Sequence, residues 1–410
     1  MIDQFFSDRL TLERLHFGPL GDHIDRFAQV LSAQGYTRLT AKAKIGAVAG
    51  LSRWLHKRGL GVEALDEQTI SKFLRYCRRR GLCRCHTAHT LQDLLKHLRD
   101  GGIVREVAAV EKSALYDVEE EFAQYLRHER GLIQASADNY IRTARRFLSE
   151  CFGNEPLALN ELDPKQVVRF MARRSKGMGP RSLQLMAIAL RSFFRFLYQR
   201  GELVRDLAAA VPKVANWRLS ELPKFLEPEH IERLLKACPQ DTPLGQRDYA
   251  ILLLLARLGL RPGEVAHLEL DDIDWERGEI TVRGKSAWHA RLPIPWDVGE
   301  ALARYLGQSR HRCPSRRVFL RMMAPRKGFA DSTAIGEVVE RALARAGLPV
   351  RKRSYLLRHG LATRMLRGGA SLAEIGEILR HKLPSTTEIY AKVDVASLRA
   401  LALPWKGGAR

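Results

Sequence analysis

The sequence has few cysteines and no long hydrophobic run. Its most apolar stretch, Ala250 to Ala256, lies between Arg247 and Arg257 and is far shorter than the ~20 residues of a membrane-spanning helix. The N-terminal segment MIDQFFSDRLTLERL carries acidic residues early and lacks an apolar core followed by a small-residue cleavage site. We therefore expect no membrane span and no export signal. The 6 cysteines among 410 residues are expected to stay reduced in a cytoplasm.

The cysteines do not form a recognisable metal motif either. The potential ligands that cluster in one region are Cys77, Cys83, Cys85, His86 and His89. Their order contains no CxxC pair and no second ligand pair at zinc-finger spacing. Free cysteines in a basic loop are therefore favoured over zinc, and we expect neither a metal nor another cofactor.

Acidic residues are scarce relative to basic ones. The chain has 46 Asp and Glu against 68 Lys and Arg, which gives a formal net charge of +22. Hydrophobic residues make up 45% and charged residues 28%, an ordinary globular composition. Solubility alone does not require such an excess of positive charge, whereas binding to a nucleic acid, a polyanion, explains it. The length favours roughly two to four domains.

The first half of the chain repeats itself at an offset of about 95 to 100 residues. Three pairs of landmarks recur in the same order: FAQVL at 27–31 and FAQYL at 122–126, ALD at 64–66 and ELD at 161–163, and Gly101 with Ile103 against Gly201 with Leu203. Amphipathic helices often look alike, but matched landmarks in one order favour a duplication. We predict two homologous helical modules, residues 1–108 and 109–212.

Each module carries a basic, glycine-containing connector before its last helix. The connectors are RRRGLCRCHTAHT at 78–90 and RRSKGMGPRS at 173–182. Basic side chains in such segments are suited to phosphate contacts. The predicted DNA-binding residues are Arg78, Arg79, Arg80, Arg173, Arg174, Lys176 and Arg181.

A proline-containing linker at 213–224 precedes a last domain at 225–410, where the pattern becomes mixed α and β. Glu227-Pro228-Glu229 is expected to open a helix, and Asp331 and Ser371 are candidate N-caps. Helices are predicted near 247–258, 332–346, 354–367, 371–380 and 385–391, and strands at 279–282 and 291–295. The fold class is thus mainly α with a small antiparallel β-sheet in the last domain.

Three segments of the last domain carry a specific pattern. They are LGLRPGEVAHLELDDID at 258–274, LLRHGLAT at 356–363 and ILRHKLPSTTEIYAKV at 378–393. Their order and spacing resemble the signatures of the tyrosine recombinases, the phage-integrase family. The resemblance covers roughly residues 225–393 and implies two helical DNA-binding modules joined to an α+β catalytic domain. The positions matching the family's catalytic set are Arg261, Lys285, Arg358, His381 and Tyr390.

The chemistry of DNA cleavage explains the two arginines. When a phosphodiester gains a fifth oxygen ligand, negative charge builds on its non-bridging oxygens. Guanidinium groups remain charged and donate paired hydrogen bonds. Arg261 and Arg358 are therefore expected to clamp those oxygens. Glu264, one helical turn after Arg261, is expected to orient a guanidinium.

The remaining matched residues would form and break the covalent bond. Tyr390 is the expected nucleophile, whose phosphodiester with DNA stores the bond energy, so that neither ATP nor a metal is needed. Lys285, in the turn between two predicted strands, is the expected general acid for the leaving 5′ oxygen. His381 is expected to hydrogen-bond the phosphate.

One position departs from the family. Three residues before the second arginine the family usually has a histidine, whereas this chain has Tyr355. A phenol with its ordinary pKa of about 10 can donate a hydrogen bond but is a poor base at neutral pH. Neighbours on a helix face about 100° apart, so His359 beside Arg358 is not expected simply to replace that histidine.

The resemblance also implies partners and a place in the cell. The expected partner is a duplex DNA recombination site bound by a homo-tetramer, in the cytoplasm and nucleoid of a prokaryote. An apolar C-terminal tail, Val395, Leu398, Leu401, Leu403 and Trp405, is expected to dock on a neighbouring protomer, although it could pack on its own domain. Two alternatives stay open: a type IB topoisomerase or telomere resolvase, and a non-catalytic DNA-binding relative.

Overall fold

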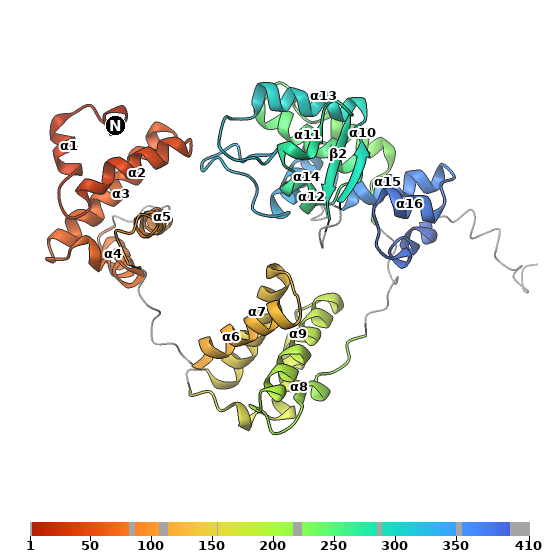
Figure 1. Cartoon of the computed structure of the whole chain (residues 1–410), viewed down its shortest axis with the longest axis horizontal. Helices are drawn as coiled ribbons and strands as arrows, with labels where there is room; N and C mark the ends of the chain where they lie inside the picture. The colour runs from red at the N-terminus through yellow and green to blue at the C-terminus, as the bar shows by residue number, and fades with distance from the viewer. Residues whose placement is uncertain are drawn as a thin grey trace, which may run out of the picture. The chain divides into compact units, whose positions relative to one another are not determined.

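A computed structural model of the chain shows mostly helical modules, each with its own hydrophobic core (Figure 1). It describes residues 2–81, 87–105, 114–153, 155–215, 224–284, 289–349 and 355–393. Within these ranges, no helix combines the length and apolar character that crossing a bilayer requires. The described residues between 106 and 220 form one compact unit, and those on either side are grouped in another.

Residues 2–105 fold as a helical module around buried aliphatic and aromatic side chains. Its elements are η1 (Ile2–Gln4), α1 (Arg9–Leu15), α2 (Gly21–Ala33), α3 (Arg38–His56), η2 (Val62–Ala64), α4 (Glu67–Arg79) and α5 (Thr87–Asp100). Asp66 begins α4 as its N-cap, because its carboxylate accepts a hydrogen bond from the Thr69 backbone N at 2.6 Å. Ile70 and Phe73 then face the core of the module.

Residues 114–215 fold around a core of packed phenylalanines. Its elements are α6 (Ala114–Gln124), the π-helical turn η3 (Tyr125–Glu129), α7 (Gln134–Phe152), η4 (Leu159–Glu161), α8 (Pro164–Ser175), α9 (Pro180–Gln199) and η5 (Leu207–Ala210). Phe147 on α7 meets Phe170 and Phe194 edge-to-face at 5.3 and 5.2 Å. This arrangement packs α7 beside α9 (Figure 1).

The two modules share one order of elements. In each, a helix of 19 residues, α3 or α7, is followed by a 3-10 turn of 3 residues, η2 or η4. An N-capping aspartate, Asp66 or Asp163, then opens the next helix. A further helix, α5 or α9, follows, and after α9 the chain adds the short turn η5.

Residues 224–393 form a helical domain that carries the small sheet. Its helices are α10 (Pro228–Lys236), α11 (Pro243–Arg257), α12 (Pro262–His267), α13 (Trp296–Arg304), α14 (Thr333–Arg345), α15 (Leu356–Arg367) and α16 (Leu372–Ile378). Its shorter turns are η6 (Leu270–Asp272), η7 (Tyr305–Ser309), η8 (Pro384–Thr386) and η9 (Glu388–Val393). The antiparallel strands β1 (Ile273–Asp274), β2 (Glu279–Arg283) and β3 (His289–Pro293) lie in that order, with Glu279 opposite Pro293 and Arg283 opposite His289.

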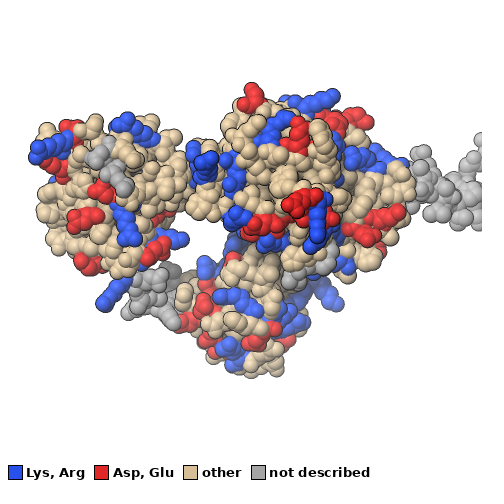
Figure 2. Space-filling model, turned by 45° about the horizontal axis from the view of Figure 1, so that its top comes forward, with Lys and Arg blue, Asp and Glu red and all other residues tan. Residues whose placement is uncertain are grey.

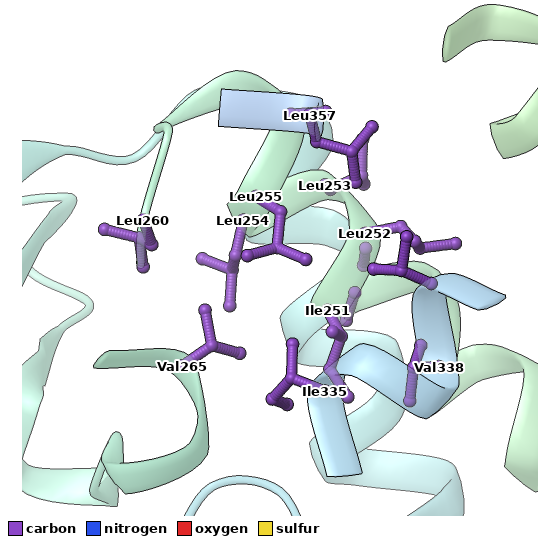
Figure 3. Packing of buried hydrophobic residues seen from close by; sticks show 14 of the residues in the cluster. Ile251, Leu252, Leu253, Leu254, Leu255, Leu260, Val265, Ile335, Val338 and Leu357 are labelled. Carbon is purple, nitrogen blue, oxygen red and sulfur yellow. The ribbon is translucent and has the colours of Figure 1, made fainter. Parts of the chain in front are cut away.

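Helix α11 is the centre of this domain. Residues Ala250–Ala256 are all buried, and the side chains of 251–255 point toward Leu260, Val265, Ile335, Val338 and Leu357 from the surrounding segments (Figure 3). Each fully buried leucine or isoleucine contributes roughly 1.5–3 kcal/mol relative to exposure. The apolar run that is too short for a membrane-spanning helix therefore lies in the core of this domain.

The predicted fold class is confirmed, with local corrections. A helix, α10, begins at Pro228 as predicted, and the predicted N-cap Ser371 forms a capping box with Glu374. Ser332, not Asp331, is the N-cap of α14, although the Asp331 carboxylate accepts a hydrogen bond from the Thr333 backbone N at 2.7 Å.

Two predicted elements differ in position or type. The last strand occupies 289–293 instead of 291–295. Instead of a helix at 385–391, the chain forms the 3-10 turns η8 and η9. The β-branched Thr386 and Thr387 lower the helix propensity of this segment, and the Thr387 hydroxyl hydrogen-bonds the His381 ring instead.

Candidate active site

Arg261 is held at the start of α12 by Glu264. The Glu264 carboxylate accepts from the Arg261 backbone N at 2.8 Å and from its Nη1 at 2.6 Å. Gly259, with φ of +56°, turns the chain just before this point, and a Cβ there would lie 2.8 Å from Leu379 and 2.9 Å from Leu361. The turn and the ion pair together fix the Arg261 guanidinium at the helix N-terminus.

Arg358, on α15, is buried with 2% of its surface exposed. Its Nη1 and Nη2 donate to the backbone carbonyls of Gly259 and Leu379. Burial, followed by the positive charges of Arg261 and Arg380, lowers the pKa of Arg358 to about 10. The guanidinium therefore stays protonated at neutral pH and ties α15 to the segments that precede α12 and follow α16.

Arg380 is a buried residue of this site that the sequence did not indicate. Its backbone has φ of +56°, the left-handed region that non-glycine residues rarely adopt. Its Nη2 donates to the Glu264 carboxylate at 3.0 Å, and its carbonyl accepts from Arg261 Nη2 at 2.9 Å. The signal available in the sequence was a third arginine directly before His381.

These contacts join two guanidiniums, Arg261 and Arg380, to one carboxylate, Glu264, and the charges of all three affect the nearby Arg358. The side chains of Arg380 and Glu264 are only 2% and 8% exposed, so water screens the excess positive charge poorly. Burial and the charge of Arg261 oppose the protonated form of Arg380, and its pKa is lowered although Glu264 acts in the other direction. The arrangement is suited to a bound anion such as a phosphodiester.

His381 follows α16 and lies beside Tyr390. Its Nδ1 is 2.8 Å from Thr387 Oγ1, and its backbone N donates to the Gly376 carbonyl at 2.8 Å. Burial and the nearby charges of Arg358 and Arg261 lower the pKa of His381 to about 4. The imidazole is therefore neutral at neutral pH.

Tyr390, in η9, is 1% exposed. Its ring lies parallel to that of His381, with centroids 6.4 Å apart, and its hydroxyl is 2.8 Å from His359 Nδ1. Burial raises the pKa of Tyr390 to about 12, which Arg358 partly opposes. The phenol is consequently protonated in this state.

Tyr355 and His359 lie on one face of α15. Tyr355 is 45% exposed, and its ring centroid is 6.2 Å from that of His359. The sequence indicated that His359 and Arg358 face different directions on the helix. It did not indicate that His359, one helical turn after Tyr355, contacts the Tyr390 hydroxyl. Spacing within the helix was the signal that could have indicated this contact.

Lys285 lies outside the described residues. Strands β2 and β3, which precede and follow it in the sequence, are paired as far as Arg283 and His289. The structure therefore brings together four of the five predicted catalytic positions, Arg261, Arg358, His381 and Tyr390, with the supporting Glu264.

The predicted DNA-binding residues lie at the ends of α4 and α8 and the start of α9. Arg173 and Arg174 form ion pairs with Glu150 at 3.1 and 2.6 Å, whereas Lys176 and Arg181 are exposed. Arg78, Arg79 and Arg80 are also exposed. On the face shown in Figure 2, basic side chains are interspersed with acidic ones and form no single unbroken track.

The cysteine–histidine cluster is only partly described, because Cys83, Cys85 and His86 lie outside the described residues. Cys77 is a buried residue of α4. Across the described ranges, no group of three or more His, Cys, Asp or Glu side chains is placed to hold a metal ion.

Known proteins match this chain along its length. The family profile "Phage integrase family" matches residues 224–397, and "Phage integrase, N-terminal SAM-like domain" matches 120–201. "Putative integrase/recombinase y4rA" of Sinorhizobium fredii is 42% identical over 411 residues, covering 99% of each chain. "Tyrosine recombinase XerA" of Pyrococcus furiosus is 32% identical over 293 residues, covering 70% of this chain and 94% of that protein.

Solved structures share the fold. XerH site-specific recombinase bound to a palindromic difH substrate has a TM-score of 0.54 at 18% identity, covering 82% of this chain and 95% of that one. The Tn1549 transposon integrase in complex with circular intermediate DNA has a TM-score of 0.51 at 19% identity, covering 69% and 98%.

The fold and the sequence matches together define an enzyme class that breaks and rejoins DNA. The chain belongs to the phage integrase family and is a tyrosine recombinase.

Proposed function

We propose that the chain cleaves and rejoins specific duplex DNA sites through a covalent 3′-phosphotyrosine at Tyr390. The observation that carries this proposal is the convergence of the Tyr390 phenol and His381 with three guanidiniums, two of which share the Glu264 carboxylate. Such a site offers a nucleophile and an excess of fixed positive charge, which are the two things that attack on a phosphodiester needs.

Arg261 and Arg358 hold the non-bridging oxygens of the scissile phosphate. Arg358 gives up its carbonyl partners for phosphate oxygens, which are stronger acceptors because they carry charge. Arg380 acts through Glu264, whose carboxylate it shares with Arg261. The guanidiniums supply the positive charge that a metal ion supplies in other phosphoryl-transfer enzymes.

His381 binds the phosphate as a neutral imidazole. When Thr387 donates its hydroxyl proton to Nδ1, Nε2 carries the ring proton and can donate it to a phosphate oxygen. The Tyr390 oxygen then forms the bond to phosphorus as the bond from phosphorus to the 5′ oxygen breaks. Lys285 protonates that oxygen, and attack by a 5′ hydroxyl later reverses the sequence.

The helical modules bind DNA outside the cleavage point. We assign residues 109–212 to the core-binding module, 1–108 to its duplicate and 225–410 to the catalytic domain, with 213–224 as linker. The shared order of elements in the two modules supports the duplication. Five of the predicted DNA-binding side chains are exposed and available to phosphates: Arg78, Arg79, Arg80, Lys176 and Arg181. Arg173 and Arg174 must first break their ion pairs with Glu150 before they can bind phosphates.

Recombination between two duplex sites requires four cleavages, so four protomers act together. Residues 395–405, outside the described residues, carry the apolar positions that dock on a neighbouring protomer. The place of action is the cytoplasm of a prokaryote, where a nucleoid offers the DNA substrate.

The experiment that tests the function uses a nicked suicide substrate, in which the released DNA fragment diffuses away and traps the covalent adduct. Wild-type protein should form an adduct. Tyr390→Phe should form none while its DNA affinity changes less than about threefold, because the variant loses one oxygen and no positive charge. An adduct at wild-type yield with the Phe variant would remove Tyr390 as the nucleophile, and no adduct with the wild type would indicate a DNA-binding relative.

A further inference from the structure

His359 makes a contact with the nucleophile that the family resemblance does not assign. Its Nδ1 lies 2.8 Å from the Tyr390 hydroxyl, with ring centroids 5.7 Å apart and planes at 59°. Tyr390 is nearly fully buried, whereas His359 is partly exposed. A proton on the phenol therefore has a nitrogen acceptor within hydrogen-bonding distance, and that acceptor borders solvent.

The fold produces this contact through the helical periodicity of α15. Arg358 is directed toward the carbonyls of Gly259 and Leu379. The next residue is rotated by about 100° around the helix, and η9 packs against α15 there. His359 thus reaches Tyr390 from the same helix that supplies the buried arginine.

The other aromatic groups at the site are less suited to accept the Tyr390 proton. His381 lies parallel to the tyrosine ring, and its Nδ1 is engaged by Thr387. Its low pKa, about 4, makes it a weak base. Tyr355 is exposed on the outer side of His359. Among the described residues, His359 Nδ1 is the group that shares a hydrogen bond with the Tyr390 hydroxyl.

We propose that His359 is the general base of strand cleavage, taking the Tyr390 proton at Nδ1 as the tyrosine oxygen bonds to phosphorus. The bond from phosphorus to the 5′ oxygen breaks in the same step, and that oxygen receives a separate proton from the acid assigned to Lys285. On rejoining, His359 returns its proton to the departing Tyr390 oxygen. The inference rests on the proposed function, because it assigns the base for that reaction.

This assignment explains how the chain tolerates Tyr355 at the usual histidine position. The imidazole is supplied one helical turn later on the same face of α15. The ionisable groups around it are Tyr355, Tyr390, His381 and, on the phosphate side, the guanidiniums of Arg261, Arg358 and Arg380. A phosphate held by those guanidiniums offsets their charge and so favours a protonated His359 after the transfer.

The test measures single-turnover adduct formation by the full-length protein on the suicide substrate between about pH 5.5 and 9. His359→Asn preserves an oxygen acceptor near the Nδ1 position but not its basicity, and His359→Ala removes both. His230→Asn, an exposed histidine on α10, is the matched control. A substrate with sulfur at the 5′-bridging position removes the need for the acid, so the remaining pH dependence reports on the base.

The Asn variant should cleave about 10²-fold more slowly or worse, the usual range for loss of a general base. Its DNA affinity should change less than about threefold. Its pH–rate profile should lack the fall in cleavage rate that protonation of the histidine causes in the wild type. The slow rate should persist on the sulfur substrate. Added imidazole should partly rescue the Ala variant, while the control cleaves at the wild-type rate.

Wild-type rates with the Asn variant, or a slow rate that keeps the wild-type pH profile, would overturn the assignment of His359 as the base. If the Asn variant fails to fold by circular dichroism, His359→Gln replaces it in the same assay. Failure of the proposed function looks different, since wild-type protein itself would then form no adduct.

Discussion

At the scale of single residues, the site depends on an imbalance of charge. Three guanidiniums, Arg261, Arg358 and Arg380, lie near a single carboxylate, Glu264, and all of these side chains except that of Arg261 are buried. Buried like charges repel, so this cluster costs stability until an anion enters. This repulsion favours binding of the scissile phosphate, because the phosphate is the anion that relieves it.

Removing Glu264 should increase the repulsion among the guanidiniums and so lower the stability of the protein. Glu264→Ala leaves the guanidiniums without their carboxylate and should lower the free energy of unfolding by about 3 kcal/mol. Sulfate should restore part of the loss by occupying the cluster. Urea unfolding in chloride and in sulfate buffers of equal ionic strength measures both effects.

The control for general salt effects is Glu276→Ala, which removes an exposed acid between β1 and β2. Sulfate stabilises most proteins modestly, so the quantity that matters is the extra gain of Glu264→Ala over this control. Equal gains in both variants would argue against an anion site at the cluster.

Lys285 is tested by its chemistry, because its position lies outside the described residues. Lys285→Ala should slow cleavage of an ordinary substrate by about 10²-fold or more. A substrate with sulfur at the 5′-bridging position should restore the rate, since a thiolate leaves without protonation. The readout is the ratio of the two cleavage rates for each protein. If sulfur gives the variant no advantage over wild type, Lys285 is not the acid.

At the scale of elements, short and irregular segments position the catalytic side chains. Arg261 begins the 6-residue helix α12, His381 lies in a loop, and Tyr390 belongs to the 3-10 turn η9. The Gly259 turn connects the central helix α11 to this group, and its carbonyl accepts from Arg358. Tight turns thus bring segments far apart in the sequence to one point.

Gly259→Ala should disturb this turn. A side chain at φ of +56° costs roughly 1–2 kcal/mol, and the new Cβ also meets Leu361 and Leu379 at under 3.0 Å. We expect a loss of about 2 kcal/mol or more in urea unfolding, together with slower adduct formation.

Gly263→Ala is the matched control for the backbone effect. Gly263 lies within α12 at negative φ, and a Cβ there meets no atom within 4 Å. Alanine should be neutral or stabilise by up to about 1 kcal/mol. A loss of stability in this control as large as that of Gly259→Ala would contradict the argument from positive φ.

At the scale of the whole molecule, the N-terminal module poses the main question. It has a separate hydrophobic core and the same order of elements as residues 114–215. A second DNA-binding module would lengthen the contacted DNA and explain part of the +22 net charge. The competing role is a cap that keeps the core-binding module folded.

Deleting residues 1–108 should separate these roles. If the module binds DNA, the footprint should shorten, and the log–log salt dependence of binding should fall by about 0.9 for each phosphate that the module neutralises. Tyr390 should still attack a suicide substrate at high protein concentration. A soluble truncated protein with the full footprint and salt dependence would refute DNA binding by the module, and an insoluble one would favour the cap.

Much of this molecule is determined by local sequence. The hydrophobic spacing, the start of α10 at Pro228, the cap at Ser371 and the short β-hairpin follow from periodicity and turn chemistry, which depend on neighbours along the chain. The residues at 261, 358, 381 and 390 were identified from their resemblance to the signatures of the family, and the chemistry of phosphodiester attack explains why guanidiniums, an imidazole and a phenol stand there.

Only the tertiary structure decided which groups touch. Arg380 sits more than a hundred residues from Glu264 in sequence, and nothing local indicates that the two share an ion pair. The contact of His359 with Tyr390 likewise depends on how η9 packs against α15. Such contacts depend on burial and packing between distant segments, and the pKa values of Arg358, His381 and Tyr390 are set by the same burial.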